Sequence, residues 1–255
     1  MSGRSGGDSA ERARAWVHGY QAEVCDVVEP WEHGTVIRAT RYPSYWDYNL
    51  VRVEDDAQLD AAAVVRFADQ ALAGLEHRRV GFEVLPSGER VRAGLEELGW
   101  KVTRLVWMQL EDPAPAGAVG DVEQVPYDGV RHLRVEWHRE DFPAVDPTDY
   151  LEHARELSAG RHAQVFAAFH RDAPVGFAQL ERADDGVEIT DVYVHPDHRG
   201  RGFGTALTQA AIDAGRDAGD LWIVADEDDR AKELYERLGF RPAWRVLDFL
   251  RVPGS

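Results

Sequence analysis

Three closely spaced glycines between a strand-like and a helix-like segment constrain this chain more than any other feature. Residues 187–194 are rich in β-branched side chains and predict a strand. The segment Arg199-Gly200-Arg201-Gly202-Phe203-Gly204 follows, and apolar residues then recur at helical spacing up to Gly215, where a C-cap belongs. The turn therefore leads directly into a helix N-terminus.

Such a turn predicts an anion site. The first turn of a helix has unpaired N–H groups and a partial positive charge, and glycines let a phosphate approach the backbone without a Cβ in the way. Arg199 and Arg201 add charge. A P-loop would need Lys and Ser or Thr after the last glycine, where this chain has Thr205-Ala206, and the Rossmann pattern fails at Leu207. The pattern indicates a diphosphate site of another kind.

The pattern Arg199-x-x-Gly202-x-Gly204, behind a strand that ends in VYVHP, resembles the acyl-CoA-binding motif of the GNAT acetyltransferases. The match continues through the short apolar strand 221–225 and then AKELYERLGF at 231–240, which is similar to that family's helix and Leu-Gly-Phe ending. The resemblance covers roughly the last 130 residues. It implies a GNAT-type N-acyltransferase that uses acetyl-CoA as cosubstrate.

The resemblance also implies where the cofactor binds. In this family the strand before the glycine turn pairs through its backbone with the pantetheine arm, and the turn holds the diphosphate. Asp228 stands where the family often has an Asn that contacts the cofactor; because Asp cannot donate, helix N-capping is its simpler role. The predicted cofactor-binding residues are Val192, Tyr193, Val194, Arg199, Gly200, Arg201, Gly202, Phe203, Gly204, Thr205 and Asp228.

Two catalytic residues follow from the same resemblance. Tyr235 lies at the position of the family's general acid, although it also belongs to an apolar helical stripe and could be core. Glu188 matches the position of a glutamate base, with Asp191, Glu181 or a water as alternatives. By strict alternation Glu188 shares a face with Val192 and Val194, but a β-bulge, usual in this family, would change that parity.

The remaining polar patterns are weaker. His195 and His198 have the spacing of a metal pair but lack a third ligand nearby, so we expect no metal ion there. Residues 137–153 connect two predicted helices where this family selects its acceptor, and they are acidic with interleaved aromatic residues. They form either a solvated loop or a rim that attracts a cation.

The composition of the chain limits the classes of molecule that it is expected to bind. The chain has 29 Lys and Arg against 46 Asp and Glu, a net charge of -17, which argues against nucleic acid or an anionic membrane and favours a cationic acceptor. Its single cysteine, Cys25, excludes an internal disulfide and predicts a cytoplasmic setting. No apolar run approaches the length of about 20 residues that spans a membrane. We expect a small-molecule amine as substrate, and the sequence leaves a homodimer open.

The element order occurs twice. Residues 94–110 align with 234–250 at a constant offset of 140, which favours duplication over chance. We predict an α/β fold of two GNAT-like domains, each a mixed, mostly antiparallel sheet flanked by helices, at 1–112 (1–9 disordered) and 121–255 with a linker at 113–120. Helices are predicted at 11–28, 59–75, 88–98, 129–139 and 148–158, and strands at 35–41, 48–53, 79–84, 101–109, 162–169 and 175–181, besides those named above.

The two copies differ where the cofactor would bind. After its corresponding strand the first copy has Glu54-Asp55-Asp56 and no glycine, and carboxylates at a helix N-terminus repel a diphosphate. Leu95 replaces Tyr235. We therefore expect the second domain to be the catalytic one, acetylating a primary amine. The alternatives are a non-catalytic acyl-CoA-binding or regulatory protein and an acetyltransferase that acts on a protein or peptide amine.

Overall fold

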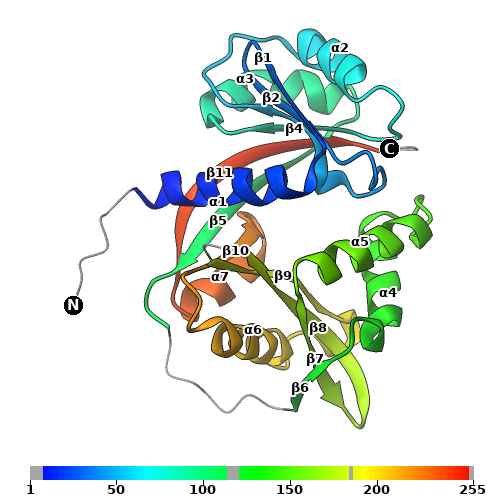
Figure 1. The fold of residues 1–255 in the computed structure, drawn as a ribbon, viewed down its shortest axis with the longest axis vertical. Helices are drawn as coiled ribbons and strands as arrows, with labels where there is room; N and C mark the ends of the chain where they lie inside the picture. Colours follow the sequence, from blue (N-terminus) through cyan, green and yellow to red (C-terminus); the bar gives the residue numbers. More distant parts are fainter. Residues whose placement is uncertain (1–7, 114–120, 184–185, 253–255) are drawn as a thin grey trace. The chain divides into compact units, whose positions relative to one another are not determined.

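The computed structural model describes residues 8–113, 121–183 and 186–252 (Figure 1). Its backbone contacts divide into two compact units. Unit 1 holds the chain up to Val106, with Asp226–Asp228 and the chain from Trp244 onward, and unit 2 holds Trp107–Ala225 and Asp229–Ala243. Within the described residues, no helix combines the length and the apolar character that a membrane crossing requires.

The first half of the chain forms a mixed sheet with three helices. β1, β2 and β3 are antiparallel neighbours, and β3 is parallel to β4. Buried side chains from α2, α3 and the strands form its core. In chain order the elements are α1 (Ser9–Val24), β1 (Val27–Trp31), β2 (Gly34–Arg38), the short helix η1 (Trp46–Tyr48), β3 (Asn49–Val53), α2 (Ala61–Ala71), β4 (Arg78–Phe82), α3 (Leu85–Glu97) and β5 (Lys101–Leu110).

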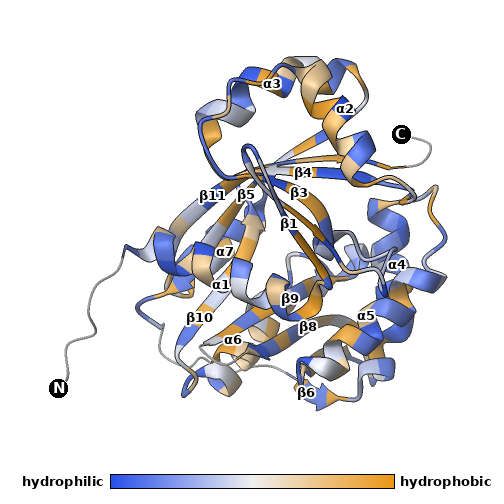
Figure 2. Ribbon diagram, turned by 45° about the horizontal axis from the view of Figure 1, so that its top comes forward, coloured by the Kyte–Doolittle hydropathy of each residue, from blue (hydrophilic) through white to orange (hydrophobic). Residues whose placement is uncertain are grey.

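The second half repeats this plan with additions at its start. β6 to β9 are antiparallel neighbours and β10 is parallel to β9. Figure 2 shows the hydrophobic residues gathered along strands such as β3 and β9. The elements are β6 (Val122–Val125), η2 (Tyr127–Val130), α4 (Arg131–Asp141), α5 (Thr148–Gly160), β7 (Gln164–His170), β8 (Ala173–Ala183), β9 (Gly186–Val194), η3 (Pro196–His198), α6 (Phe203–Gly215), β10 (Asp220–Asp226), α7 (Arg230–Arg237) and β11 (Phe240–Arg251).

The two halves share one order of elements. β1-β2-β3-α2-β4-α3-β5 corresponds to β7-β8-β9-α6-β10-α7-β11, and the third and fourth strands are parallel in both. At the offset of 140, α3 ends at Glu97 and α7 at Arg237, and each helix is followed by a glycine of positive φ, 81° at Gly99 and 101° at Gly239. This agreement in conformation supports duplication.

The last strand of each half pairs outside its own half. β4 pairs with β11, with Val80 opposite Phe249, and Arg79 Nε donates to Asp248 Oδ1 at 2.9 Å. Burial raises the pKa of Asp248, although Arg79 opposes the shift. β5 lies beside β10 in the sheet order, and Gln109 Nε2 donates to an oxygen of the Asp220 carboxylate at 2.8 Å.

The fold class predicted from the sequence is confirmed. Two predictions about elements were wrong or incomplete: the first helix ends at Val24 rather than at residue 28, because Val27–Trp31 pair with β2 as a strand, and β6 was missed. Residues 1–7 and most of the predicted linker, 114–120, lie outside the described residues, and Ser9 already begins α1. The boundaries of the two domains stay a prediction, since the contact units divide β5 and β11 between them.

Candidate active site

The parallel strands β9 and β10 pair only over their first residues. The ladder joins Gly186–Ile189 to Asp220–Ile223, and among the described residues no pair between these two strands follows Ile189. β9 continues beside β8 as far as Val194, opposite Gly176. Beyond Ile189 the edge of β9 that faces β10 is therefore open, and backbone donors and acceptors at an unpaired edge can bind an extended ligand.

A β-bulge interrupts β9 at this opening. Thr190 lies opposite Gln179 and Tyr193 opposite Phe177, so Asp191 and Val192 together face one residue, Ala178. Asp191 has a φ of 54°, which is rare for a residue other than glycine. The family resemblance made a bulge the alternative to strict alternation in this strand, and the bulge is present.

The bulge reverses the side-chain parity of β9. Val187 and Val194, seven positions apart, both face α6, since a Cβ on Gly215 would lie 3.1 Å from Val187 and one on Gly204 would lie 3.9 Å from Val194. Strict alternation puts residues an odd number apart on opposite faces. Glu188 therefore does not share a face with Val194, which is the outcome expected for a bulged strand rather than for strict alternation.

The glycine turn is open on its outer side. Gly200 and Gly202 have φ values of 75° and 88°, and a Cβ on either would meet no atom within 4 Å. Gly202 is the N-cap residue of α6. Gly204 is helical, and a Cβ there would lie 3.5 Å from Leu234 of α7. The turn, the end of β9 and α7 thus meet at one corner, where α6 directs N–H groups outward.

The residues around the turn differ in how fully they are engaged. Arg199 Nε donates to the Val194 carbonyl oxygen at 2.9 Å, and its guanidinium pairs with Glu140 at 2.7 Å, so its charge is already partly compensated. Arg201 and Thr205 are exposed. The Phe203 ring packs against His198, with ring centroids 6.1 Å apart.

The side chain of Tyr193 is engaged within the protein, and the Arg199 guanidinium lies over its ring at 5.8 Å. Its ring packs in the core with residues of η2 and α4, and its hydroxyl donates to Glu140 at 3.3 Å. Desolvation and the neighbouring Glu140 raise the pKa of Tyr193 to about 12. Any contact of Tyr193 with a ligand in the β9–β10 opening would therefore be made by its backbone.

Tyr235 occupies the inner face of α7. It is 5% exposed and packs edge to face with Phe240, at a ring-centroid distance of 6.2 Å. Burial, with a smaller contribution from Asp229, raises its pKa, so the phenol keeps its proton at neutral pH. Among the described residues its hydroxyl has no hydrogen-bond partner. These facts suit both a core residue and a proton donor, whereas Leu95, its counterpart in the first half, can only be core.

The three candidate bases lie on one face of the sheet. Glu188 is buried and stands opposite Glu181 across β8 and β9. Glu181 is held by Arg161 at 2.9 Å and by Gln179 at 2.6 Å, and burial raises its pKa although Arg161 opposes the shift. Asp191 is paired with Arg134 at 2.8 Å. Two of the candidates are thus bound to buried arginines, which favours a structural role for them.

Arg134 is the residue of this region that the sequence did not identify. It is buried on α4, where it pairs with Asp191 and donates to Gln179 at 2.8 Å. Its guanidinium stacks over Tyr127 at 4.0 Å and Phe177 at 4.5 Å. The available signal was its position four residues after Val130 on the buried stripe of the helix. Its role here is to hold the bulge of β9.

Asp228 does not cap α7. The N-cap is Asp229, whose side chain accepts from the Ala231 N–H, so the predicted capping role falls one residue later. The Asp228 N–H instead donates to Asp226 at 3.0 Å. A cofactor contact of Asp228 stays a prediction.

His195 and His198 lie before the turn. Their ring centroids are 5.9 Å apart, and the Asp197 N–H donates to His195 Nδ1. Desolvation and the neighbouring Arg201 lower the pKa of His198, so it remains neutral. A neutral imidazole can donate one hydrogen bond to a phosphate beside the turn.

A hollow of about 540 Å³ lies at the connection between α4 and α5. Its charged lining residues are Arg131, Arg139 and Asp146, so it is mixed in charge rather than acidic. Of the aromatic residues predicted to line an acceptor rim, Trp137 packs on Phe177. Some of the side chains of this segment therefore make contacts inside the protein instead of lining an open rim.

Comparison with known proteins agrees with this geometry. The model of the acetyltransferase (GNAT) family matches residues 131–240. The chain is 31% identical to an uncharacterized N-acetyltransferase of Mycobacterium bovis over 112 residues, which are 39% of this chain and 72% of that protein. It is 38% identical to an uncharacterized N-acetyltransferase of Methanocaldococcus jannaschii over 90 residues, 31% of this chain and 39% of the other, so it spans well under half of that relative.

A solved structure matches almost the entire chain. The GCN5-related N-acetyltransferase from Kribbella flavida superposes with a TM-score of 0.56 at 17% identity, covering 98% of both chains, which is a similarity of fold. The family match in the second half and the identity across most of the mycobacterial relative decide the assignment. The chain belongs to the acetyltransferase (GNAT) family.

Proposed function

We propose that the second half of the chain transfers an acetyl group from acetyl-CoA to the primary amine of a small molecule, by direct attack in a ternary complex. The observation that carries this proposal is the opening between β9 and β10, which leads to an uncovered glycine turn at the N-terminus of α6. An open strand edge suits the amide-containing pantetheine arm, and the helix N-terminus suits the diphosphate.

Different segments of the chain would bind different parts of acetyl-CoA. The backbone from Arg199 to Gly204, with the exposed Arg201 and Thr205, would bind the diphosphate. The backbone of Val192, Tyr193 and Val194 would pair with pantetheine. A backbone N–H in the opening would polarise the thioester carbonyl, and most side-chain substitutions would leave that group in place. Asp228 would contribute a further contact as an acceptor.

Two proton transfers complete the reaction. The amine nitrogen forms a bond to the acetyl carbon while the carbon–sulfur bond breaks, and the amine loses one proton to a base. Tyr235 would give its proton to the departing thiolate and regain one from solvent afterwards; burial keeps the phenol protonated until then but also makes it a weaker acid. Glu188 is our choice of base, directly or through water, because it matches the position of the family's glutamate base.

The first half would not bind the cofactor. Its helix α2 is capped by Asp60, whose carboxylate accepts from the Ala63 N–H where a phosphate would otherwise bind. β3 and β4 are paired to their ends, and the Glu83 N–H donates to the Val53 carbonyl oxygen at 2.9 Å. We infer that this half is a degenerate GNAT-like domain that supports the catalytic one.

The acceptor is proposed from charge. A net charge of -17 attracts cationic amines and disfavours nucleic acid and anionic membranes as partners. The single cysteine suits a cytoplasmic setting.

Two measurements test the proposal. Isothermal titration of the full chain with CoA should give saturable binding, and a thiol-release assay with acetyl-CoA should identify an amine from a panel that contains polyamines, amino acids, aminoglycosides and peptides. Binding without release for any amine would favour the non-catalytic alternative. No binding of CoA would refute both.

A further inference from the structure

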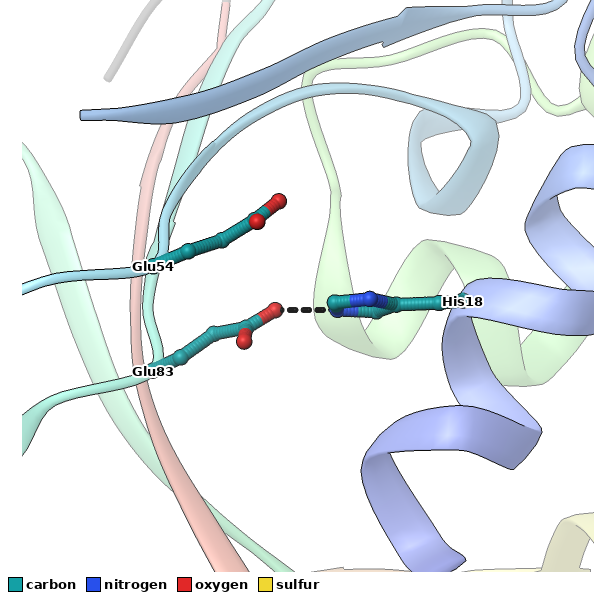
Figure 3. A group of neighbouring side chains, drawn as sticks. All are labelled: His18, Glu54 and Glu83. Carbon is teal, nitrogen blue, oxygen red and sulfur yellow. Dashed lines mark hydrogen bonds and ion pairs between the residues drawn. The ribbon is translucent and has the colours of Figure 1, made fainter. Parts of the chain in front are cut away.

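Three potential metal ligands meet in the first half of the chain, away from the glycine turn in sequence. His18 comes from α1, and Glu54 and Glu83 directly follow β3 and β4. Each offers one ligand atom, and these atoms all lie within 4.8 Å of one another. Figure 3 shows the imidazole of His18 pointing toward the Glu83 carboxylate, with the Glu54 carboxylate beside it.

The backbone fixes the two glutamates as neighbours. β3 and β4 are parallel and in register as far as Val53 and Phe82, so the next residue of each strand leaves the sheet at the same end. The hydrogen bond from the Glu83 N–H to the Val53 carbonyl oxygen, 2.9 Å, extends the pairing by one residue. This arrangement is held by the sheet, not by the side chains themselves.

Glu83 has acceptor capacity that the protein leaves unused. Its side chain is only 3% exposed, and its Oε1 lies 2.6 Å from His18 Nε2. Its other oxygen, Oε2, is buried and has no hydrogen-bond partner among the described residues. A buried carboxylate oxygen without a partner is unfavourable, and a cation would supply the missing interaction.

The charge at this point also favours a cation. Two carboxylates lie together, and in the described part of the chain the arginine that pairs with them is Arg52, whose Nε is 3.1 Å from Glu54 Oε1. The Arg52 guanidinium is shared with a second partner, because it also donates to Gln21 at 3.1 Å. The site can be reached from solvent, because the side chains of His18 and Glu54 are 28% and 31% exposed.

We propose that His18, Glu54 and Glu83 bind one divalent first-row transition-metal cation, for which Zn²⁺ is the appropriate probe. One imidazole nitrogen and two carboxylate oxygens form a ligand set that suits Zn²⁺, with a water in the fourth position. On binding, the cation would take the place of the proton between His18 Nε2 and Glu83 Oε1, and that proton would pass to His18 Nδ1 or to solvent. The site is independent of acetyl transfer and would stabilise α1 against β3 and β4.

The test uses the full chain, treated with EDTA and dialysed. Isothermal titration with Zn²⁺ should give one strong site per chain, and Co²⁺ at the same site should give the visible absorption of a low-coordinate complex. Glu83→Gln keeps the shape and can still bond to His18, so it should fold normally by circular dichroism and lose the strong site. His18→Ala should lose it as well.

The matched control is His33→Ala. His33 pairs with Asp55 at 3.2 Å in the same half of the chain but lacks a third ligand, so this variant should bind Zn²⁺ as the native chain does. The proposal is overturned if the native chain binds no Zn²⁺, or if His18→Ala and Glu83→Gln retain the strong site. In the latter case the metal would be bound elsewhere, for example by the histidines near the glycine turn.

Discussion

The strand pairs β3/β4 and β9/β10 occupy the same place in the two halves, yet only one of them is open. β3 and β4 are paired as far as their carboxyl ends, whereas β9 and β10 separate after Ile189. The difference follows from residues that local patterns reveal poorly: β9 carries a bulge at Asp191, held by the buried Arg134. An identical plan of strands and helices can thus provide a ligand site or close it.

The segments that follow β3 and β9 also differ in whether they leave room for an anion. The second half continues into an uncovered glycine turn, while the first continues into acidic residues, with Asp56 paired to Arg90 and Asp60 capping α2. Carboxylates therefore occupy the positions that phosphate oxygens would take. The comparison supports our proposal that cofactor binding and catalysis reside in the second half.

The largest effect is expected from Gly202→Glu. The new side chain would place a carboxylate in the open space at the N-terminus of α6, where it would repel and displace the diphosphate. We expect CoA affinity to fall by at least about 1000-fold, roughly 4 kcal/mol, in isothermal titration.

Gly74→Glu is its matched control in the first half. Gly74 has a φ of 87°, nearly that of Gly202, and a Cβ there would also meet no atom within 4 Å. The two substitutions cost the same backbone strain, so only the ligand site distinguishes them. Equal CoA binding by both variants would contradict the comparison.

Tyr235→Phe should slow turnover by about 100-fold, because it removes the proton donor for the thiolate. The ring and its packing on Phe240 would remain, so CoA affinity should change little. Steady-state kinetics and titration on the same preparation separate the two quantities. A variant with native turnover would make Tyr235 a core residue, like Leu95.

The glycines that follow α3 and α7 provide a test of stability. A Cβ on Gly239 would collide with the Asp112 carbonyl oxygen, whereas one on Gly99 would meet nothing within 4 Å. Both have positive φ, which costs alanine about 1 kcal/mol. We expect Gly99→Ala to lose about that much and Gly239→Ala about 3 kcal/mol in urea unfolding. Equal losses would show that the two turns have the same surroundings.

The last test concerns the pH dependence of stability in the first half. His77 is buried, its Nε2–H donates to the Asn49 carbonyl oxygen at 2.8 Å, and desolvation lowers its pKa to about 4. Because the unfolded chain takes up this proton near pH 6.5, the stability contributed by neutral His77 is complete above that pH and is lost as pH falls toward 4.

We expect the native chain to lose about 2 kcal/mol from this group between pH 7 and pH 4.5. His77→Gln keeps a donor for Asn49 but cannot titrate in this range. Its free energy of unfolding should therefore depend less on pH, as measured by urea unfolding at several pH values. An unchanged pH dependence would assign the acid sensitivity to other groups.

Much of this architecture follows from the sequence. The glycine turn, the helix after it and the paired repeat at residues 94–110 and 234–250 were predicted, because each depends on local spacing or on a family pattern. The bulge was considered only as an alternative to strict alternation. β1 was missed because Pro30 interrupts an otherwise strand-like run, and β6 because it has only four residues.

Two further features could not be read locally. Arg134 looks like a surface residue on a helix until Asp191, 57 positions away, is placed beside it. β4 pairs with β11, although the sequence would equally allow either strand to pair with another one. The alternation of side chains along a strand does not indicate which partner that strand takes. Long-range pairing of this kind needs the three-dimensional structure.

That pairing has a consequence for how the protein is made. Arg79 and Asp248 are separated by 169 positions, so a ribosome releases β4 long before β11 is synthesised. Until then β4 has an uncovered edge that a nascent neighbour could join, and contacts so distant in sequence form slowly. Chaperone protection during translation would matter more for this chain than for two separately closed domains.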